Sequence, residues 1–136
     1  MRRLALPLAL ALILALSAPV SAATSTYKAK MIGPGPTGTV TVSISGSTGT
    51  LKWNLSGIAK HSTLVVVVRG GTCADRLGLV VKSTWESPFR DGTSVQTRTL
   101  QPEWVTFFKR NWTSRGGDVA IVKNDGHSQC LALVKQ

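Results

Sequence analysis

The stretch from His61 to Cys73, HSTLVVVVRGGTC, constrains the fold of this 136-residue chain more than any other. It contains five consecutive aliphatic residues, four of them β-branched, which favour a strand over a helix. Such a continuous apolar run is typical of a strand that is covered on both faces. Gly70 and Gly71 then mark a turn. Because a buried strand needs partners on both sides, we expect a protein built from sheets.

The segments around this run alternate apolar and polar residues. Residues 39–44 and 51–55 show this period of two, and the Gly/Ser-rich residues between them predict a hairpin. Further short strands are predicted at 26–31, 63–69, 77–82, 93–100, 118–123 and 130–134. About eight short strands with closely spaced turn signals favour an all-β sandwich or barrel.

One segment departs from the strand pattern and predicts a short helix or a long loop around residues 102–112. Pro102 and Glu103 are typical of a first helical turn, and Lys109 and Arg110 of a last one. Apolar residues three and four positions apart lie between them, which is the spacing of a helix face.

The first 22 residues have the organisation of a secretory signal peptide. Arg2 and Arg3 precede an apolar core at 4–16, and small residues lead up to Ala22. The core is shorter than the 20 or so residues of a membrane-spanning helix. We therefore expect cleavage after Ala22, a single β-sandwich domain over 23–136 with no integral membrane segment, and a secreted or periplasmic location.

Cys73 and Cys130 are the only cysteines of the chain. In an exported protein two cysteines indicate a disulfide first, and two buried free thiols remain the alternative. They form a poor zinc site because supporting histidines are missing.

The chain is basic, with a formal net charge of +10. Removal of Arg2 and Arg3 with the signal would lower this charge to +8. A cationic surface fits a polyanionic partner such as nucleic acid, an anionic polysaccharide or another cell-envelope component. Solubility explains the charge equally simply, and we prefer it because the cations are scattered and Lys109–Arg110 is the one tight pair. We expect a monomer.

Aromatic residues gather between the predicted strands, interleaved with cations. They suggest either a binding face or the lid of the sandwich core, and we favour the lid because a small sandwich needs one. The candidate face comprises Trp85, Phe89, Arg90, Trp104, Phe108, Lys109, Arg110, Trp112 and Arg115.

Three segments together resemble the copper/zinc superoxide dismutase superfamily and its chordin-type (CHRD) relatives. These are GTVTVSI at 38–44, GTLKWNLSGI at 49–58 and VVVVRGGTC at 65–73, followed by DVAIVK and CLALV. The resemblance implies a Greek-key antiparallel β-sandwich. It also implies a disulfide from the cysteine after the ligand-bearing strand to one in the final strand, here Cys73–Cys130.

The metal ligands that this resemblance calls for are absent from the sequence. The His-x-His pair falls on Val67 and Arg69, and the late copper histidine falls near Lys123. Valine cannot ligate a metal, and a permanently charged guanidinium repels one. His61 and His127 are the only histidines, and His127 occupies the position of a cationic residue three before the second cysteine. We expect no metal and no other cofactor.

Three hypotheses follow. The first is an exported, non-enzymatic binding or structural module with a degenerate dismutase-like fold. The second is a polyanion-binding protein that uses the basic-aromatic segment 85–115. The third is an enzyme, a diverged dismutase or a hydrolase, although no catalytic constellation is visible: Asp125, His127 and Ser128 stand side by side as in a turn, and no G-x-S-x-G motif occurs.

Overall fold

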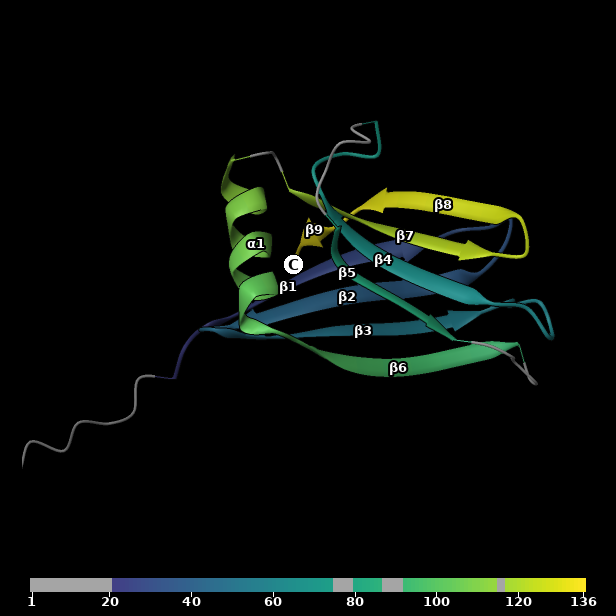
Figure 1. Ribbon diagram of the computed structural model, residues 1–136, viewed down its shortest axis with the longest axis horizontal. Helices are drawn as coiled ribbons and strands as arrows, with labels where there is room; N and C mark the ends of the chain where they lie inside the picture. The colour runs from purple at the N-terminus through teal and green to yellow at the C-terminus, as the bar shows by residue number, and fades with distance from the viewer. Residues whose placement is uncertain (1–20, 75–79, 87–91, 115–116) are drawn as a thin grey trace, which may run out of the picture.

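The computed structural model describes residues 21–74, 80–86, 92–114 and 117–136, with the backbone alone for 80–86 and 111–114. Two antiparallel sheets pack against each other, and one helix stands at an end of the sandwich (Figure 1). The elements are β1 (Thr24–Met31), β2 (Thr37–Ser45), β3 (Thr48–Ser56), β4 (Leu64–Gly70), β5 (Val80–Glu86), β6 (Thr93–Leu100), α1 (Pro102–Ser114), β7 (Asp118–Asn124), β8 (His127–Ala132) and β9 (Val134–Lys135).

The strand order confirms the predicted all-β sandwich. One sheet has the order β6-β3-β2-β1-β9 and the other β5-β4-β7-β8. Nine strands are described where about eight were expected, and the additional one, β9, has two residues. Two pairings join strands that are distant along the chain, β3 with β6 and β4 with β7. Crossovers of this kind are compatible with a Greek key, which stays a prediction.

The predicted hairpin is confirmed as β2 and β3. Its register pairs Val40 with Trp53 and Val42 with Leu51, and all four side chains are buried. Gly46 begins the connecting turn with a φ of 60°, which favours glycine. The alternation in the sequence therefore sets which face of the five-stranded sheet turns to the core.

The valine-rich run forms β4, an inner strand between β5 and β7. Leu64, Val66 and Val68 face the core and are essentially inaccessible, whereas Val65 and Val67 on the outer face are half-buried. The expectation of full cover on both faces is thus met on one face only. An inner strand keeps its aliphatic outer side chains half-covered because neighbouring strands flank them.

The core lies between the two sheets and is almost entirely apolar. Trp53 is its largest fully buried side chain. Its indole Nε1 donates a hydrogen bond of 2.9 Å to the hydroxyl of Ser94, which is also buried. This bond satisfies the one polar atom of the indole and fixes β6 against β3.

Helix α1 confirms the helix predicted around 102–112 and runs to Ser114. Val105 and Phe108 are buried, and the Phe108 ring meets that of Tyr27 edge-on with 4.9 Å between centroids. Trp104 packs against the same core from a partly buried position. Placing Phe108 on an exposed binding face is therefore wrong, because its position three residues after Val105 turns it to the core. No helix in the described ranges is long and apolar enough to cross a membrane.

The C-terminal strand begins earlier than predicted, at His127 rather than Cys130. Asp125 and Gly126 form a two-residue turn with positive φ at both positions, and this geometry extends the β7–β8 pairing back to Asn124 and His127. Leu133 is buried and donates its N–H to the Asp118 carbonyl at 2.9 Å. Beyond this residue the chain leaves one sheet and joins β1 of the other as β9.

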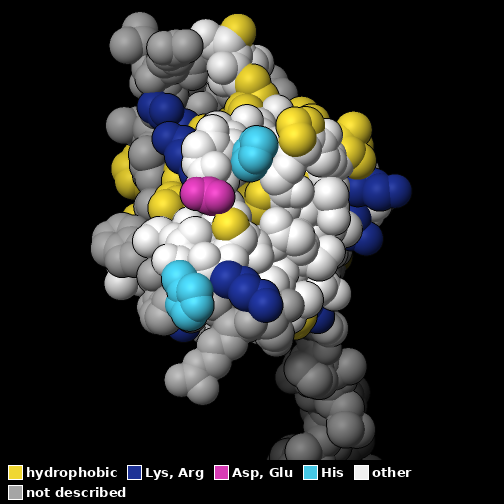
Figure 2. Space-filling model, turned by 90° about the vertical axis from the view of Figure 1, so that its right-hand side faces the viewer, with side chains coloured by type: hydrophobic (Ala, Val, Ile, Leu, Met, Phe, Trp, Pro, Cys, Tyr) yellow, Lys and Arg dark blue, Asp and Glu magenta, His cyan; other side chains and the backbone are white. Residues whose placement is uncertain are grey.

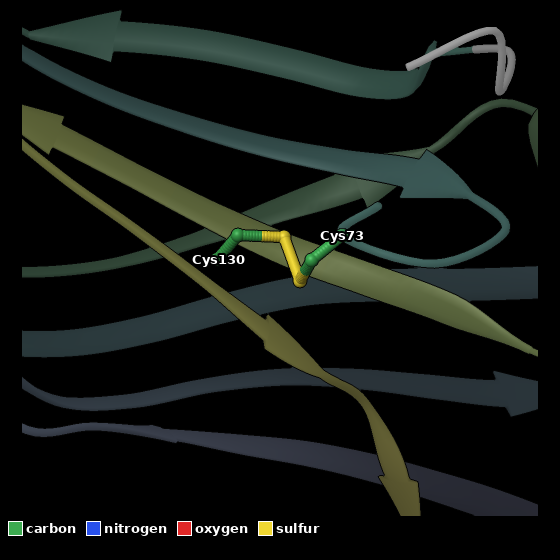
Figure 3. The surroundings of a disulfide bond; sticks show 2 residues. All are labelled: Cys73 and Cys130. Atoms are coloured by element: carbon green, nitrogen blue, oxygen red, sulfur yellow. A yellow bond between two sulfur atoms is a disulfide. The ribbon is translucent and has the colours of Figure 1, made fainter. Parts of the chain in front are cut away.

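The disulfide between Cys73 and Cys130 is confirmed. It connects the chain just after β4 with β8, and β7 lies between these two strands in the sheet (Figure 3). The Cα atoms are 5.8 Å apart and 57 residues separate the two cysteines. The bond therefore ties the valine-rich stretch to the C-terminal part of the chain.

Candidate functional site

The three positions that the dismutase resemblance assigns to metal ligands lie on one face of the molecule. Val67 and Arg69 belong to β4 and Lys123 to β7, and the register places all three on the outer face of the four-stranded sheet. Lys123 pairs with Val65, and Val67 pairs with Ile121, so Lys123 stands diagonally across from Val67. We call this surface the ligand-position face.

The disulfide belongs to the same face. Cys130 pairs with Ile121, which in turn pairs with Val67, so the three residues form one row across β8, β7 and β4. The side chains in this row are half-buried. The centre of the ligand-position face is therefore aliphatic and covalently fastened, with cationic side chains at Arg69 and Lys123.

A cleft of about 330 Å³ opens at one end of this face. It lies around the β7–β8 turn and is lined by Thr63, Val65, Lys123, Asn124, Asp125, Gly126, His127 and Ser128. Figure 2 looks onto this end of the sandwich, where histidine, acidic and basic side chains appear together on the surface. The cleft thus offers charged groups of both signs and the hydroxyl groups of Thr63 and Ser128.

Asn124 is the buried polar residue that shapes this end. Its Oδ1 accepts a hydrogen bond of 2.9 Å from Ala59 N, and its Nδ2 donates to the Thr63 carbonyl at 3.1 Å and to the Ser62 hydroxyl at 2.6 Å. The side chain is 3% exposed. These bonds hold the loop between β3 and β4, which contains His61, against the end of β7.

The charged side chains of the cleft lie on the surface around the β7–β8 turn. Asp125, His127 and Ser128 are all exposed, Asp125 in the two-residue turn with Gly126 and the other two at the start of β8. The prediction that all three lie in a turn is therefore correct for Asp125 alone. A catalytic set needs partners held in fixed orientation by their surroundings. Within the described ranges, no three His, Cys, Asp or Glu side chains stand close enough together to hold a metal ion.

The basic-aromatic segment is divided between core and surface. Phe107, Lys109 and Arg110 are exposed on α1, and the Arg110 guanidinium lies 5.7 Å from the Phe107 ring centroid. The Lys109 ammonium donates to the carbonyl of Gly46 in the β2–β3 turn. Phe89, Arg90 and Arg115 lie outside the described residues, as do the side chains of Trp85 and Trp112.

The structure also assembles a cationic face that the sequence does not reveal. Lys28 and Lys30 are more than 20 positions from Lys52 along the chain, yet all three point outward from the five-stranded sheet. The alternation in β1 places Lys28 and Lys30 on one face, a signal that the sequence does contain. The position of Lys52 beside them depends on the register of three strands.

Comparison of the chain with protein-family models, with curated proteins and with solved structures finds no match.

Proposed function

We propose that the protein is an exported, non-enzymatic binding or structural module built on a dismutase-like β-sandwich. The observation that carries this proposal is the ligand-position face. The three positions of Val67, Arg69 and Lys123 lie on one outer surface, and they present an aliphatic and two cationic side chains. Such side chains do not bind copper or zinc.

Two further features support the dismutase-like part of the proposal. The disulfide joins the chain after β4 to β8, near the C-terminus, which is the connection that the resemblance implies. The strand that would present ligands, β4, is an inner strand flanked by β5 and β7. The disulfide and the position of β4 are therefore compatible with the superfamily, whereas the side chains at its metal-ligand positions are not metal ligands.

Export is part of the same proposal. The predicted cleavage site after Ala22 lies two residues before Thr24, where β1 begins. Cleavage there would leave every strand of the sandwich complete. A disulfide is also the expected use of two cysteines in an oxidising compartment.

A superoxide dismutation assay tests the proposal against the enzyme hypothesis. The mature protein is incubated with Cu(II) and Zn(II), passed through a desalting column and assayed. We expect the rate of superoxide loss to equal that of a metal-treated protein without a copper site, because the three positions supply no ligand. A rate that rises in proportion to protein concentration would show a diverged dismutase and overturn the proposal.

Binding of polyanions by segment 85–115 is a second candidate function, and one observation favours it. Lys109 and Arg110 are exposed at adjacent positions of α1, and Arg110 lies over an exposed aromatic ring. The burial of Phe108 removes one of its proposed contacts. If this candidate is right, replacing both cations in K109Q/R110Q weakens retention on a DNA column, and unchanged retention would reject it.

A further inference from the structure

The side chains on the outer face of the five-stranded sheet are nearly all of two chemical kinds. Apart from Asn54, Val95 and Val134, every outward position of its strands carries a hydroxyl or an ammonium group. No acidic side chain belongs to these strands. The hydroxyl positions are Thr24, Thr26, Thr37, Thr39, Thr41, Ser43, Ser45, Thr48, Thr50, Ser56, Thr93, Thr97 and Thr99. We call this surface the hydroxyl face.

The lysines of the hydroxyl face are spaced by the sheet itself. The register runs Lys28–Thr41–Lys52–Thr97 across β1, β2, β3 and β6, so β2 separates the two lysines. Neighbouring strands are about 4.8 Å apart, which places the Lys28 and Lys52 backbones about 10 Å from each other. Lys30 lies two residues from Lys28, a distance of about 7 Å. All three ammonium groups can therefore reach one segment of an extended anion.

A shallow groove adjoins this lysine row. It has a volume of about 180 Å³ and lies on the same face, toward the β2–β3 turn. Its lining consists of Thr24, Ser43, Ser45, Thr48, Gly49, Thr50 and Thr99. Six of these residues carry a hydroxyl group. Two of the hydroxyls already donate within the chain, that of Ser45 to the Ala22 carbonyl and that of Thr48 to the Ser45 carbonyl, and both can still accept a hydrogen bond.

We propose that the hydroxyl face binds an acidic polysaccharide, with Lys28, Lys30 and Lys52 facing its carboxylate or sulfate groups and the groove facing its sugar hydroxyls. This inference rests on the proposed function as a binding module and names its partner class. Charge complementarity selects an anion, because the face has three cations and no acid. The hydroxyl groove selects a sugar over a nucleic acid, whose single strands are bound by stacking on aromatic side chains that this face lacks.

The test measures the affinity of the disulfide-intact mature protein for a fluorescent heparin oligosaccharide across a series of salt concentrations. K28Q/K52Q should weaken binding about tenfold or more and lower the salt dependence, since each lysine near an anionic surface contributes substantially. K60Q/K123Q removes the same charge from exposed lysines that lie off this face, and it should leave the affinity nearly unchanged. Thermal unfolding checks that each variant remains folded.

A second variant separates sugar recognition from simple charge attraction. T50V/T99V removes two cross-strand hydroxyls of the groove and preserves the shape of both side chains. It should weaken heparin binding severalfold without changing the salt dependence, and it should leave any binding of a single-stranded DNA of equal charge as it was.

Three outcomes would overturn the inference. An equal loss of heparin affinity in K28Q/K52Q and K60Q/K123Q would show that the oligosaccharide binds to the cationic protein without preferring the hydroxyl face. A loss of heparin affinity in K109Q/R110Q alone would place the binding site on α1. The protein would then still be a binding module, but the hydroxyl face would not be its binding site. Equal or tighter binding of single-stranded DNA or of phosphatidylglycerol vesicles would assign a different partner. The dismutation assay does not depend on any of these results. It can therefore reject the proposed non-enzymatic function separately from the proposed polysaccharide site.

Discussion

The side-chain oxygen of Asn124 accepts a hydrogen bond of 2.9 Å from the backbone N–H of Ala59, 65 residues earlier in the chain. The same carboxamide donates to the Thr63 carbonyl. One buried side chain thus satisfies backbone groups at both ends of a loop that has no strand partner of its own. Such an arrangement fixes the entry into β4, the strand around which the second sheet is built.

Replacing this residue tests how far the loop depends on it. Asn124→Ala should lower the free energy of unfolding by about 1–3 kcal/mol, because the Ala59 N–H and the Thr63 carbonyl lose their partner in a partly buried site. Urea unfolding measures the change. Asn54→Ala, at an exposed strand position, is the matched control and should shift stability by less than about 0.5 kcal/mol. Equal effects of the two substitutions would refute the role of Asn124.

The disulfide makes a second prediction. Cys73 and Cys130 are 57 residues apart, and closing a loop of this length removes enough unfolded-chain entropy to stabilise the fold by about 4 kcal/mol. The C73S/C130S double variant should therefore unfold at a markedly lower temperature than the oxidised protein. Oxidised protein treated with reductant should show the same shift. Identical unfolding midpoints with and without reductant would mean that the sandwich does not depend on the bond.

Gly49 provides a test of the helix as a lid. A Cβ atom at this position would lie 2.9 Å from Ile44 Cδ1 and 3.0 Å from Val105 Cγ2, so both side chains would have to move to accommodate it. Gly49→Ala should then destabilise the protein by about 1–3 kcal/mol through overpacking. In a double-mutant cycle, Val105→Ala should relieve part of this cost. Strictly additive effects would show that α1 does not press on β3 at this point.

Export makes a prediction about the mature protein. Cleavage after Ala22 predicts a product that begins at Ala23 and retains β1 from Thr24 onward. Mass spectrometry of protein produced in a bacterial host with its own leader, after separation of periplasm, medium and cytoplasm, measures the new terminus. Intact precursor in the cytoplasm as the sole product would reject the signal-peptide assignment.

Much of the fold follows from local patterns in the sequence. The alternation of Val40, Val42, Leu51 and Trp53 already determines which side chains of β2 and β3 are buried, because the side-chain period of a strand is two. The helix is equally predictable, from Pro102 at its start and from apolar residues three and four positions apart. The disulfide between Cys73 and Cys130 is predictable because the chain has two cysteines and begins like a secretory signal peptide, and exported proteins commonly form disulfides.

The remaining features depend on contacts between distant segments. The strand partner of α1 is one example, since the Phe108 ring contacts Tyr27, which lies on a strand 81 positions earlier. Where the chain passes from one sheet to the other, Leu133 bonds to Asp118 and Gln136 bonds to Thr26 of β1, and both partners are distant in sequence. The hydroxyl face likewise emerges only when the register of β1, β2 and β3 places Lys52 in one row with Lys28. Periodicity along one strand carries no information about which strand lies next to it.

The metal content of the exported mature protein tests the central claim most directly. Protein is purified without chelators from a host grown with added copper and zinc, and its metal is measured by mass spectrometry. Because Val67, Arg69 and Lys123 occupy the ligand-position face, we predict only traces of either metal, far below one ion per chain. One copper or zinc per chain that resists a weak chelator would contradict the account.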